Sequence, residues 1–321
     1  MDLCAHRRYV KAMWLLFAFS GPILWALSTH IDKYLVDRYF QGSDTSVLML
    51  FTALLGVALL PLIWWFDPAV LAPDRQSILV MTASGILYMG AMLFYLRAIQ
   101  SEEASVVAPL FQANTLFTFL LAYLFLRESL GWMQLAGAAL VIGGALSLSL
   151  RKGLRLSGFR ASFKGRLVLL MLAATVAIAV STVLFKYFAV RDRFWTTTFW
   201  TFAGEGLFGA GLLAMPGERR EFFALFRRNP GAVLGVNGAN ELINLGGGLG
   251  VRYASLLAPV GLVSAISSTT TFFVFAFGIL LTRFFPRFGR EDLSPANLLQ
   301  KAAGAVLISA GVVLIEFKMG T

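Results

Sequence analysis

The feature that most constrains this chain is a series of long apolar runs, each bounded by charged residues, proline or glycine. A helix of about 20 apolar residues crosses the roughly 30 Å of bilayer hydrocarbon while its backbone hydrogen-bonds to itself. The runs cover residues 12–36, 45–66, 76–99, 104–126, 132–150, 165–188, 195–215, 231–251, 255–284 and 298–317. Only 14% of the 321 residues are charged, which is too little polar surface to coat a soluble globule. We therefore predict an all-α integral membrane protein with ten transmembrane helices.

The net charge of +10 does not indicate a nucleic-acid partner. The lysines and arginines form short clusters between apolar runs, as expected of loops near anionic lipid. The only cysteine, Cys4, can form no internal disulfide, and His6 and His30 make no metal cluster with it. We expect no metal and no cofactor. The basic start followed by a long apolar run is typical of a signal anchor that remains as the first helix.

An internal repeat relates the two halves of the chain. The first run contains ALSTHIDKYLV (26–36), and the sixth contains AVSTVLFKYFAV (179–190). Likewise, ASVVAP (104–109) returns as ASLLAP (254–259). Because each half has an odd number of runs, the second half must enter the membrane upside down. We predict two inverted five-helix repeats, 1–150 and 167–321, joined by a basic loop at 151–166, with a substrate site between them near the midplane.

The end of the first half resembles a known family. The stretch LAYLFLRESLGWMQLAGAALVIGGALSL is similar to the EamA domains of the drug/metabolite transporter superfamily, with the turn Arg127-Glu128 before a last helix that carries Gly137 and Gly144. The resemblance implies a non-enzymatic transporter. The glycines, which return as Gly304 and Gly311, also resemble the dimer contact of small multidrug resistance proteins and would here join the two halves. The second half departs from the pattern, because no glutamate follows Arg283.

The eighth run is the least apolar, and its polar residues share one helix face. Asn237, Asn240, Glu241 and Asn244 follow i, i+3, i+4, i+7 spacing. Exposing them to lipid would cost several kcal/mol, so we expect the stripe to bind the solute, with Glu241 as the main anchor. A glutamate in a low-dielectric site can also bind a proton and a substrate alternately. The alternative is that the asparagines serve as hydrogen bonds between helices.

The ninth run repeats this spacing with hydroxyl side chains. Ser264, Ser267, Ser268 and Thr271 are candidates to line the site opposite the glutamate, although such hydroxyls also bond to their own helix carbonyls. Trp200 is a candidate to stack on a ring-bearing substrate, with lipid or core contact as its alternative.

Five further residues are candidates for coupling transport to an ion gradient. Glu205 lies among glycines of the seventh run and is either a cavity carboxylate or a buried, hydrogen-bonded packing residue. His30 can exchange a proton near neutral pH and has Asp32 close by in the sequence. Lys33 and Lys186 occupy equivalent repeat positions, and lysines bind phosphate in related sugar-nucleotide carriers. Each also lies near a helix end, where its side chain can extend to the membrane interface.

No enzyme motif or phosphate-binding loop is found, so we expect transport to be passive or coupled to an ion gradient rather than driven directly by ATP. We predict a secondary-active exporter of small metabolites in a bacterial-type inner membrane, acting as a monomer or homodimer, with the lipid bilayer, a small-molecule substrate and protons as partners. The alternatives are a flippase or scramblase for a lipid-linked head group, and a membrane scaffold that transports nothing.

The charge distribution and the family resemblance predict opposite orientations of the chain in the membrane. With ten runs, ten of the 27 lysines and arginines lie on the side of the amino terminus and 17 on the opposite side. The positive-inside rule then puts both termini outside, whereas the family resemblance puts them inside. The sequence leaves both orientations open.

Overall fold

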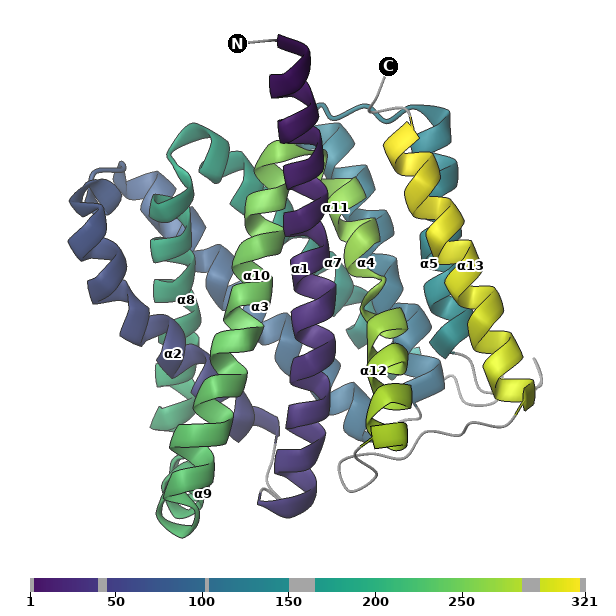
Figure 1. The fold of residues 1–321 in the computed structure, drawn as a ribbon. Helices are drawn as coiled ribbons and strands as arrows, with labels where there is room; N and C mark the ends of the chain where they lie inside the picture. Colours follow the sequence, from purple (N-terminus) through teal and green to yellow (C-terminus); the bar gives the residue numbers. More distant parts are fainter. Residues whose placement is uncertain (1–2, 40–44, 102–103, 150–164, 285–294, 318–321) are drawn as a thin grey trace.

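The computed structural model describes residues 3–39, 45–101, 104–149, 165–284 and 295–317, and every regular element in those ranges is helical (Figure 1). In chain order the elements are α1 (Leu3–Arg38), α2 (Thr45–Phe66), η1 (Pro68–Leu71), α3 (Arg75–Ser101), α4 (Ala104–Leu126), α5 (Trp132–Ser149), α7 (Gly165–Arg191), α8 (Phe194–Ala214), α9 (Pro216–Arg228), η2 (Ala232–Asn237), α10 (Gly238–Leu257), α11 (Val260–Ser267), α12 (Thr270–Phe284) and α13 (Pro295–Phe317). Of the basic loop predicted at 151–166, residues 151–164 lie outside the described residues.

Most helices fall where the apolar runs predict them. The bounds of α2 and α4 are those expected from the sequence, 45–66 and 104–126. Five stretches in the described residues are long and apolar enough to cross a membrane: Met13–Leu35, Ser46–Phe66, Arg75–Arg97, Leu169–Arg191 and Val260–Phe284. Shorter apolar helices cover Ala113–Leu126, Trp132–Ser147 and Lys301–Ile315. The chain is a multi-pass helical membrane protein.

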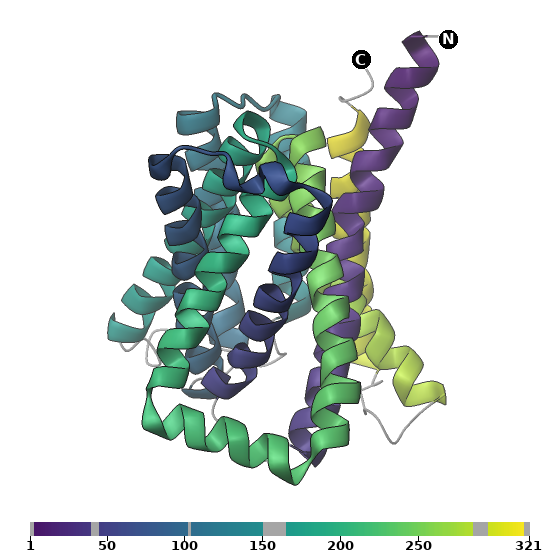
Figure 2. The same ribbon diagram turned by 90° about the vertical axis from the view of Figure 1, so that its left-hand side faces the viewer.

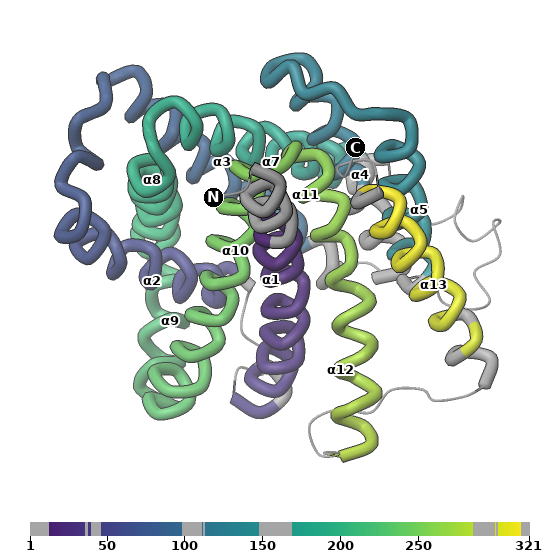
Figure 3. Tube along the Cα trace, turned by 45° about the horizontal axis from the view of Figure 1, so that its top comes forward, coloured from purple at the N-terminus to yellow at the C-terminus, as the bar shows by residue number. Residues whose placement is uncertain are grey.

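Helices α5 and α13 lie side by side at one edge of the bundle, because their glycines bring the two backbones together (Figure 1, Figure 3). A Cβ on Gly137 would lie 2.7 Å from the carbonyl oxygen of Gly311, and a Cβ on Gly144 would lie 2.7 Å from that of Gly304. The contact moves forward along α5 as it moves backward along α13, so the helices are antiparallel. The glycine contact predicted to join the two halves is confirmed.

Helix α8 packs tightly against α2 and α3. A Cβ on Gly204 would collide with the carbonyl of Thr82 in α3, and one on Gly209 would lie 2.6 Å from the Cβ of Ala53 in α2. Small residues permit such close approach in an apolar environment. The packing places Glu205, which follows Gly204, in the interior of the bundle, where it is 4% exposed.

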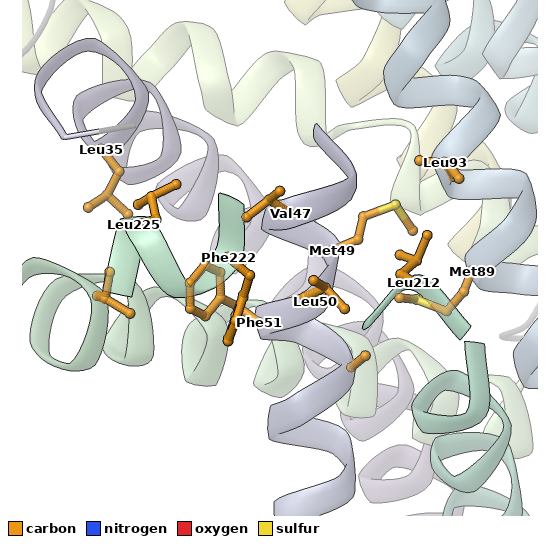
Figure 4. Close-up of a cluster of buried hydrophobic side chains, with 12 residues drawn as sticks. Leu35, Val47, Met49, Leu50, Phe51, Met89, Leu93, Leu212, Phe222 and Leu225 are labelled. Carbon is orange, nitrogen blue, oxygen red and sulfur yellow. The ribbon is translucent and has the colours of Figure 1, made fainter. Parts of the chain in front are cut away.

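The ten apolar runs do not include a helix that lies between the seventh run and the eighth. Residue Pro216 opens this helix, α9, because proline at the first helical position loses no hydrogen bond. Helix α9 lies across the end of the bundle and joins α8 to η2 and α10 (Figure 2). Its Phe222 and Leu225 enter a buried cluster with Leu35 of α1 and Phe51 of α2 (Figure 4).

Two predicted spans are not continuous α-helices. The eighth begins as the π-helical segment η2 before α10, and it extends to Leu257 rather than to 251. The ninth, predicted at 255–284, is divided: Pro259 precedes α11, and a second break at Ser268 and Thr269 precedes α12. Proline has no amide hydrogen, and it excludes the residue before it from helical geometry. Ala258, which precedes Pro259, is accordingly extended, with φ of −144° and ψ of 164°.

The described chain begins and ends at one end of the bundle. The start of α1 and the end of α13 lie together there, and α9 lies at the opposite end (Figure 1).

Candidate functional site

Helices α1 and α10 bring the two sets of polar candidates together. They pack closely and run antiparallel, since Gly250 of α10 meets Ser20 of α1, whereas Asn240 meets Asp32. A Cβ on Gly247 would lie 3.0 Å from Nε1 of Trp25, the indole that donates to the Asn244 carbonyl oxygen at 3.2 Å. Glycines on the shared surface thus set the distance at which the polar side chains meet.

Asp32 and Asn240 form the centre of this site. Nδ2 of Asn240 donates a hydrogen bond of 2.6 Å to Oδ1 of Asp32, across 208 positions of sequence. Asn240 is 1% exposed and Glu241 8% exposed, whereas Asp32 is exposed. The polar cluster therefore extends from an accessible carboxylate into the interior of the bundle.

Glu241 continues the cluster inward. Its carboxylate interacts with the side chains of Thr52 in α2 and Asn244 in α10, and it lies close enough to Asp32 for the two carboxylates to interact electrostatically. Three buried polar atoms of the stripe have no hydrogen-bond partner within the part of the chain that the structure describes: Nδ2 of Asn237, Oδ1 of Asn240 and Oε2 of Glu241. Buried polar groups are normally satisfied, so these atoms are candidates to hydrogen-bond a ligand.

A second charged pair is buried between α8 and α10. Nη2 of Arg252 lies 2.9 Å from Oε1 of Glu205, with side-chain exposures of 20% and 6%. The guanidinium also lies 5.1 Å from the ring centroid of Phe185 and 5.2 Å from that of Phe202. Glu205 is thus buried and hydrogen-bonded, as one of its two expected roles requires. The sequence does not single out Arg252, because a position along one helix does not reveal a partner on another helix.

A third cluster joins α7 to the start of α11. Lys186 forms an ion pair with Glu128 and donates a hydrogen bond of 2.7 Å to the carbonyl of Ala258. Oε2 of Glu128 accepts a hydrogen bond of 2.8 Å from the amide of Val260, the first residue of α11. The φ of 54° at Arg127 turns the chain so that Glu128 faces inward. The side chains of Lys186 and Glu128 are 11% and 15% exposed, so the expectation that Lys186 extends to the interface is wrong.

Lys33, the repeat counterpart of Lys186, is exposed and has no ion-pair partner among the described residues. The two lysines are expected to be equivalent from the repeat, but no glutamate follows Arg283 to match Glu128.

The hydroxyls predicted to face the glutamate contact another helix. Ser264 lies 3.4 Å from Oδ1 of Asn114 and 3.3 Å from the hydroxyl of Thr115, both in α4, and Ser268 lies 3.5 Å from the same Thr115 hydroxyl. Ser267 bonds to its own helix at the carbonyl of Val263, as the alternative interpretation expects.

The three remaining candidates are His30 and Trp200, which each contact a backbone carbonyl of another element, and Thr271, which is half-buried. His30 contacts the carbonyl of Val274 in α12 at 2.9 Å through Nε2, and Nε1 of Trp200 donates to the carbonyl of Val70 in η1 at 2.8 Å. Trp200 packs against a core cluster, so core contact is the better of its two interpretations. Thr271 is half-buried near the start of α12.

Comparison with known proteins identifies the first half of this arrangement. Residues 12–150, which span α1 to α5, match the model of the EamA-like transporter family. This stretch belongs to that family. The EamA stretch thus contributes Asp32 and Glu128, while the segment that follows it contributes Asn240, Glu241 and Lys186.

The fold of the whole chain is also found in a solved structure. A structure described as "Crystal structure of protein" has a TM-score of 0.62 with this chain at 19% identity, and the match covers 94% of this chain and 96% of the other. No curated protein matches the chain. The EamA assignment and the apolar helices point to a membrane transporter of the drug/metabolite type.

Proposed function

We propose that the protein is a secondary-active exporter of small metabolites, located in a bacterial-type inner membrane, that works by alternating access between two inverted five-helix repeats, 1–150 and 167–321. The observation that carries the proposal is the buried stripe of α10, whose Asn240 and Glu241 keep unpartnered polar atoms next to Asp32 of the first repeat. A site built from both halves changes its geometry when one half moves against the other.

The pattern of helix packing supports the inverted repeat. Helix α1 packs on α10, and the corresponding helices after exchange of the halves, α7 and α3, also pack on each other. Helix α5 packs antiparallel to its counterpart α13 through glycines. Since this glycine contact forms within one chain, a monomer is the proposed unit of transport.

The two ends of the bundle differ in a way that supports alternating access. The Lys186–Glu128 pair ties α7 to the start of α11, which lies at the end where α1 begins (Figure 1). Asp32 lies near the other end of α1 and is exposed. We infer that solute enters the site past Asp32 and leaves when the Lys186–Glu128 pair opens.

Protons are the proposed coupling ion. Asp32, which is exposed, and Glu241, which is buried, are neighbouring carboxyl groups that can exchange a bound proton for a bound amine or hydroxyl of the substrate. The amides of Asn237 and Asn240 would then orient the solute.

The test uses purified protein in liposomes that contain a pH-sensitive dye, with amino acids, primary amines and hexoses added in turn. We expect at least one class to drive proton movement, and Glu241→Gln to abolish it. The matched control is Glu218→Gln, the same chemical change at the end of the bundle, which should keep wild-type flux. Equal flux in Glu241→Gln and wild type would refute the role of Glu241. Transbilayer movement of labelled lipid without solute-driven proton movement would instead support a flippase.

A further inference from the structure

Helix α9 has an inward face that is fully engaged by the protein. Phe222 and Leu225 are buried, and the ring of Phe222 lies 5.0 Å from that of Phe51 in α2 (Figure 4). On the same side, Glu218 accepts a hydrogen bond of 2.6 Å from the hydroxyl of Ser46, and Asn229, which follows the helix, donates to the Tyr39 carbonyl at 3.3 Å. Polar and apolar contacts together hold α9 in one orientation across the end of the bundle.

The outward face of α9 is basic. Arg219, Arg220, Arg227 and Arg228 are all exposed, and none of them forms an ion pair with a carboxylate among the described residues. At 100° per residue, Arg220 and Arg227 lie near the middle of this face, and Phe223, which is 50% exposed, lies between Arg219 and Arg227. Arg219, Arg220 and Arg227 thus lie around an exposed aromatic ring on a helix that is fixed in place, and Arg228 lies at the edge of the same face.

The position of α9 limits what can contact this face. The helix connects α8 to α10 and runs across the bundle rather than along it (Figure 2). A helix at the end of membrane-spanning helices, lying across them, is at the level of the lipid headgroups. Basic residues on such a helix gain from anionic headgroups, and an aromatic ring among them enters the boundary with the acyl chains.

We propose that the outward face of α9 binds anionic phospholipid headgroups. Arg220 and Arg227 contact the phosphates, Arg219 and Arg228 extend the site at both sides, and Phe223 inserts beside the acyl chains. Of the two carboxylates of α9, Glu218 is directed to Ser46, and Glu221 is half-buried and has an interaction of its own. The inference is independent of the transported solute, since it concerns the lipid contact of a helix outside the polar stripe.

The proposal is tested by the relative association of spin-labelled phosphatidylglycerol and phosphatidylcholine with the full-length protein in liposomes. The variant Arg220→Gln/Arg227→Gln should lose selectivity for phosphatidylglycerol by about fivefold for each arginine, or about 30-fold for both. The control Arg97→Gln/Arg283→Gln removes the same charge from two other exposed arginines and should keep most of the wild-type selectivity. The variant Arg220→Lys/Arg227→Lys retains the charge and should also keep it.

A second measurement separates lipid from an acidic soluble partner. A spin label at Phe223→Cys, in a Cys4→Ser background, should be more accessible to oxygen than to a water-soluble nickel chelate. Equal selectivity for the two lipids in the wild type, or a label that favours the nickel chelate, would overturn the proposal. If Arg220→Gln/Arg227→Gln fails to fold, added salt should still reduce the wild-type selectivity, and a selectivity unchanged by salt would also overturn it.

Discussion

Two neighbouring glycines of α5 allow close packing to be separated from helix propensity. A Cβ on Gly144 would lie 2.7 Å from the carbonyl oxygen of Gly304 and 2.8 Å from Cγ1 of Ile308, whereas a Cβ on Gly143 would meet nothing within 4 Å. A backbone carbonyl cannot rotate out of the way. The variant Gly144→Ala therefore requires α5 and α13 to separate by roughly 0.7 Å, the difference from an ordinary 3.4 Å contact.

The expected magnitude follows from two opposing terms. Alanine in place of glycine stabilises a helix by about 0.5–1 kcal/mol, and both variants share this gain. Overpacking costs about 1–3 kcal/mol and applies only to Gly144→Ala. The free energy of unfolding should therefore be about 1–3 kcal/mol lower for Gly144→Ala than for Gly143→Ala, and Gly143→Ala should be at least as stable as the wild type.

The assay is unfolding in mixed micelles by increasing SDS, followed by far-ultraviolet circular dichroism, with both variants and the wild type measured together. The comparison needs no absolute stability, because the two variants differ in composition from the wild type by the same methyl group. Unfolding free energies that agree within about 0.5 kcal/mol would show that α5 and α13 do not meet at Gly144, and the reasoning would fail.

Three further outcomes are expected. Glu205→Gln leaves its buried guanidinium partner without a carboxylate and should lower the free energy of unfolding by about 3–5 kcal/mol in the same titration. Lys186→Met should lower the melting temperature in detergent, whereas Lys33→Met, at an exposed position, should change stability by less than about 0.5 kcal/mol. Hydrogen bonds from the Ser77 hydroxyl and amide lower the pKa of Asp74 from 3.8. The folding stability that the Asp74 carboxylate adds is therefore present above that pH and is lost as the pH falls through the lowered pKa. The melting temperature of the wild type should thus fall more than that of Asp74→Asn between about pH 5 and pH 3.

The sequence predicts the helices whose ends are chemically marked. Helix α2 stops before Asp67 and Pro68, and α4 stops before Arg127, so their apolar runs have unambiguous bounds. Helix α9 is missed because proline and glycine suggest a turn, although proline is equally favourable as the first residue of a helix. The break between α11 and α12 is missed because Ser264, Ser267 and Ser268 have the spacing of one continuous face.

The site is predicted only in part, because periodicity describes one helix at a time. The spacing of Asn240 and Glu241 is visible in the sequence, and the cost of exposing them to lipid indicates that they face inward. Their contact with Asp32 and the pairing of Arg252 with Glu205 depend on which helices become neighbours. In both cases the partners are far apart in the chain, by 208 and 47 positions, and no local pattern connects them.

The difference between Lys186 and Lys33 has a consequence for the transport cycle proposed for this protein. If the repeats were energetically equal, the states open to either side of the membrane would be equally populated. The Lys186–Glu128 pair has no counterpart at the other end among the described residues, so its net free energy favours one of these states. Each 1.4 kcal/mol of that difference changes the population ratio about tenfold. In the proposed cycle, the resting protein would therefore populate mainly the state in which the Lys186–Glu128 pair is formed.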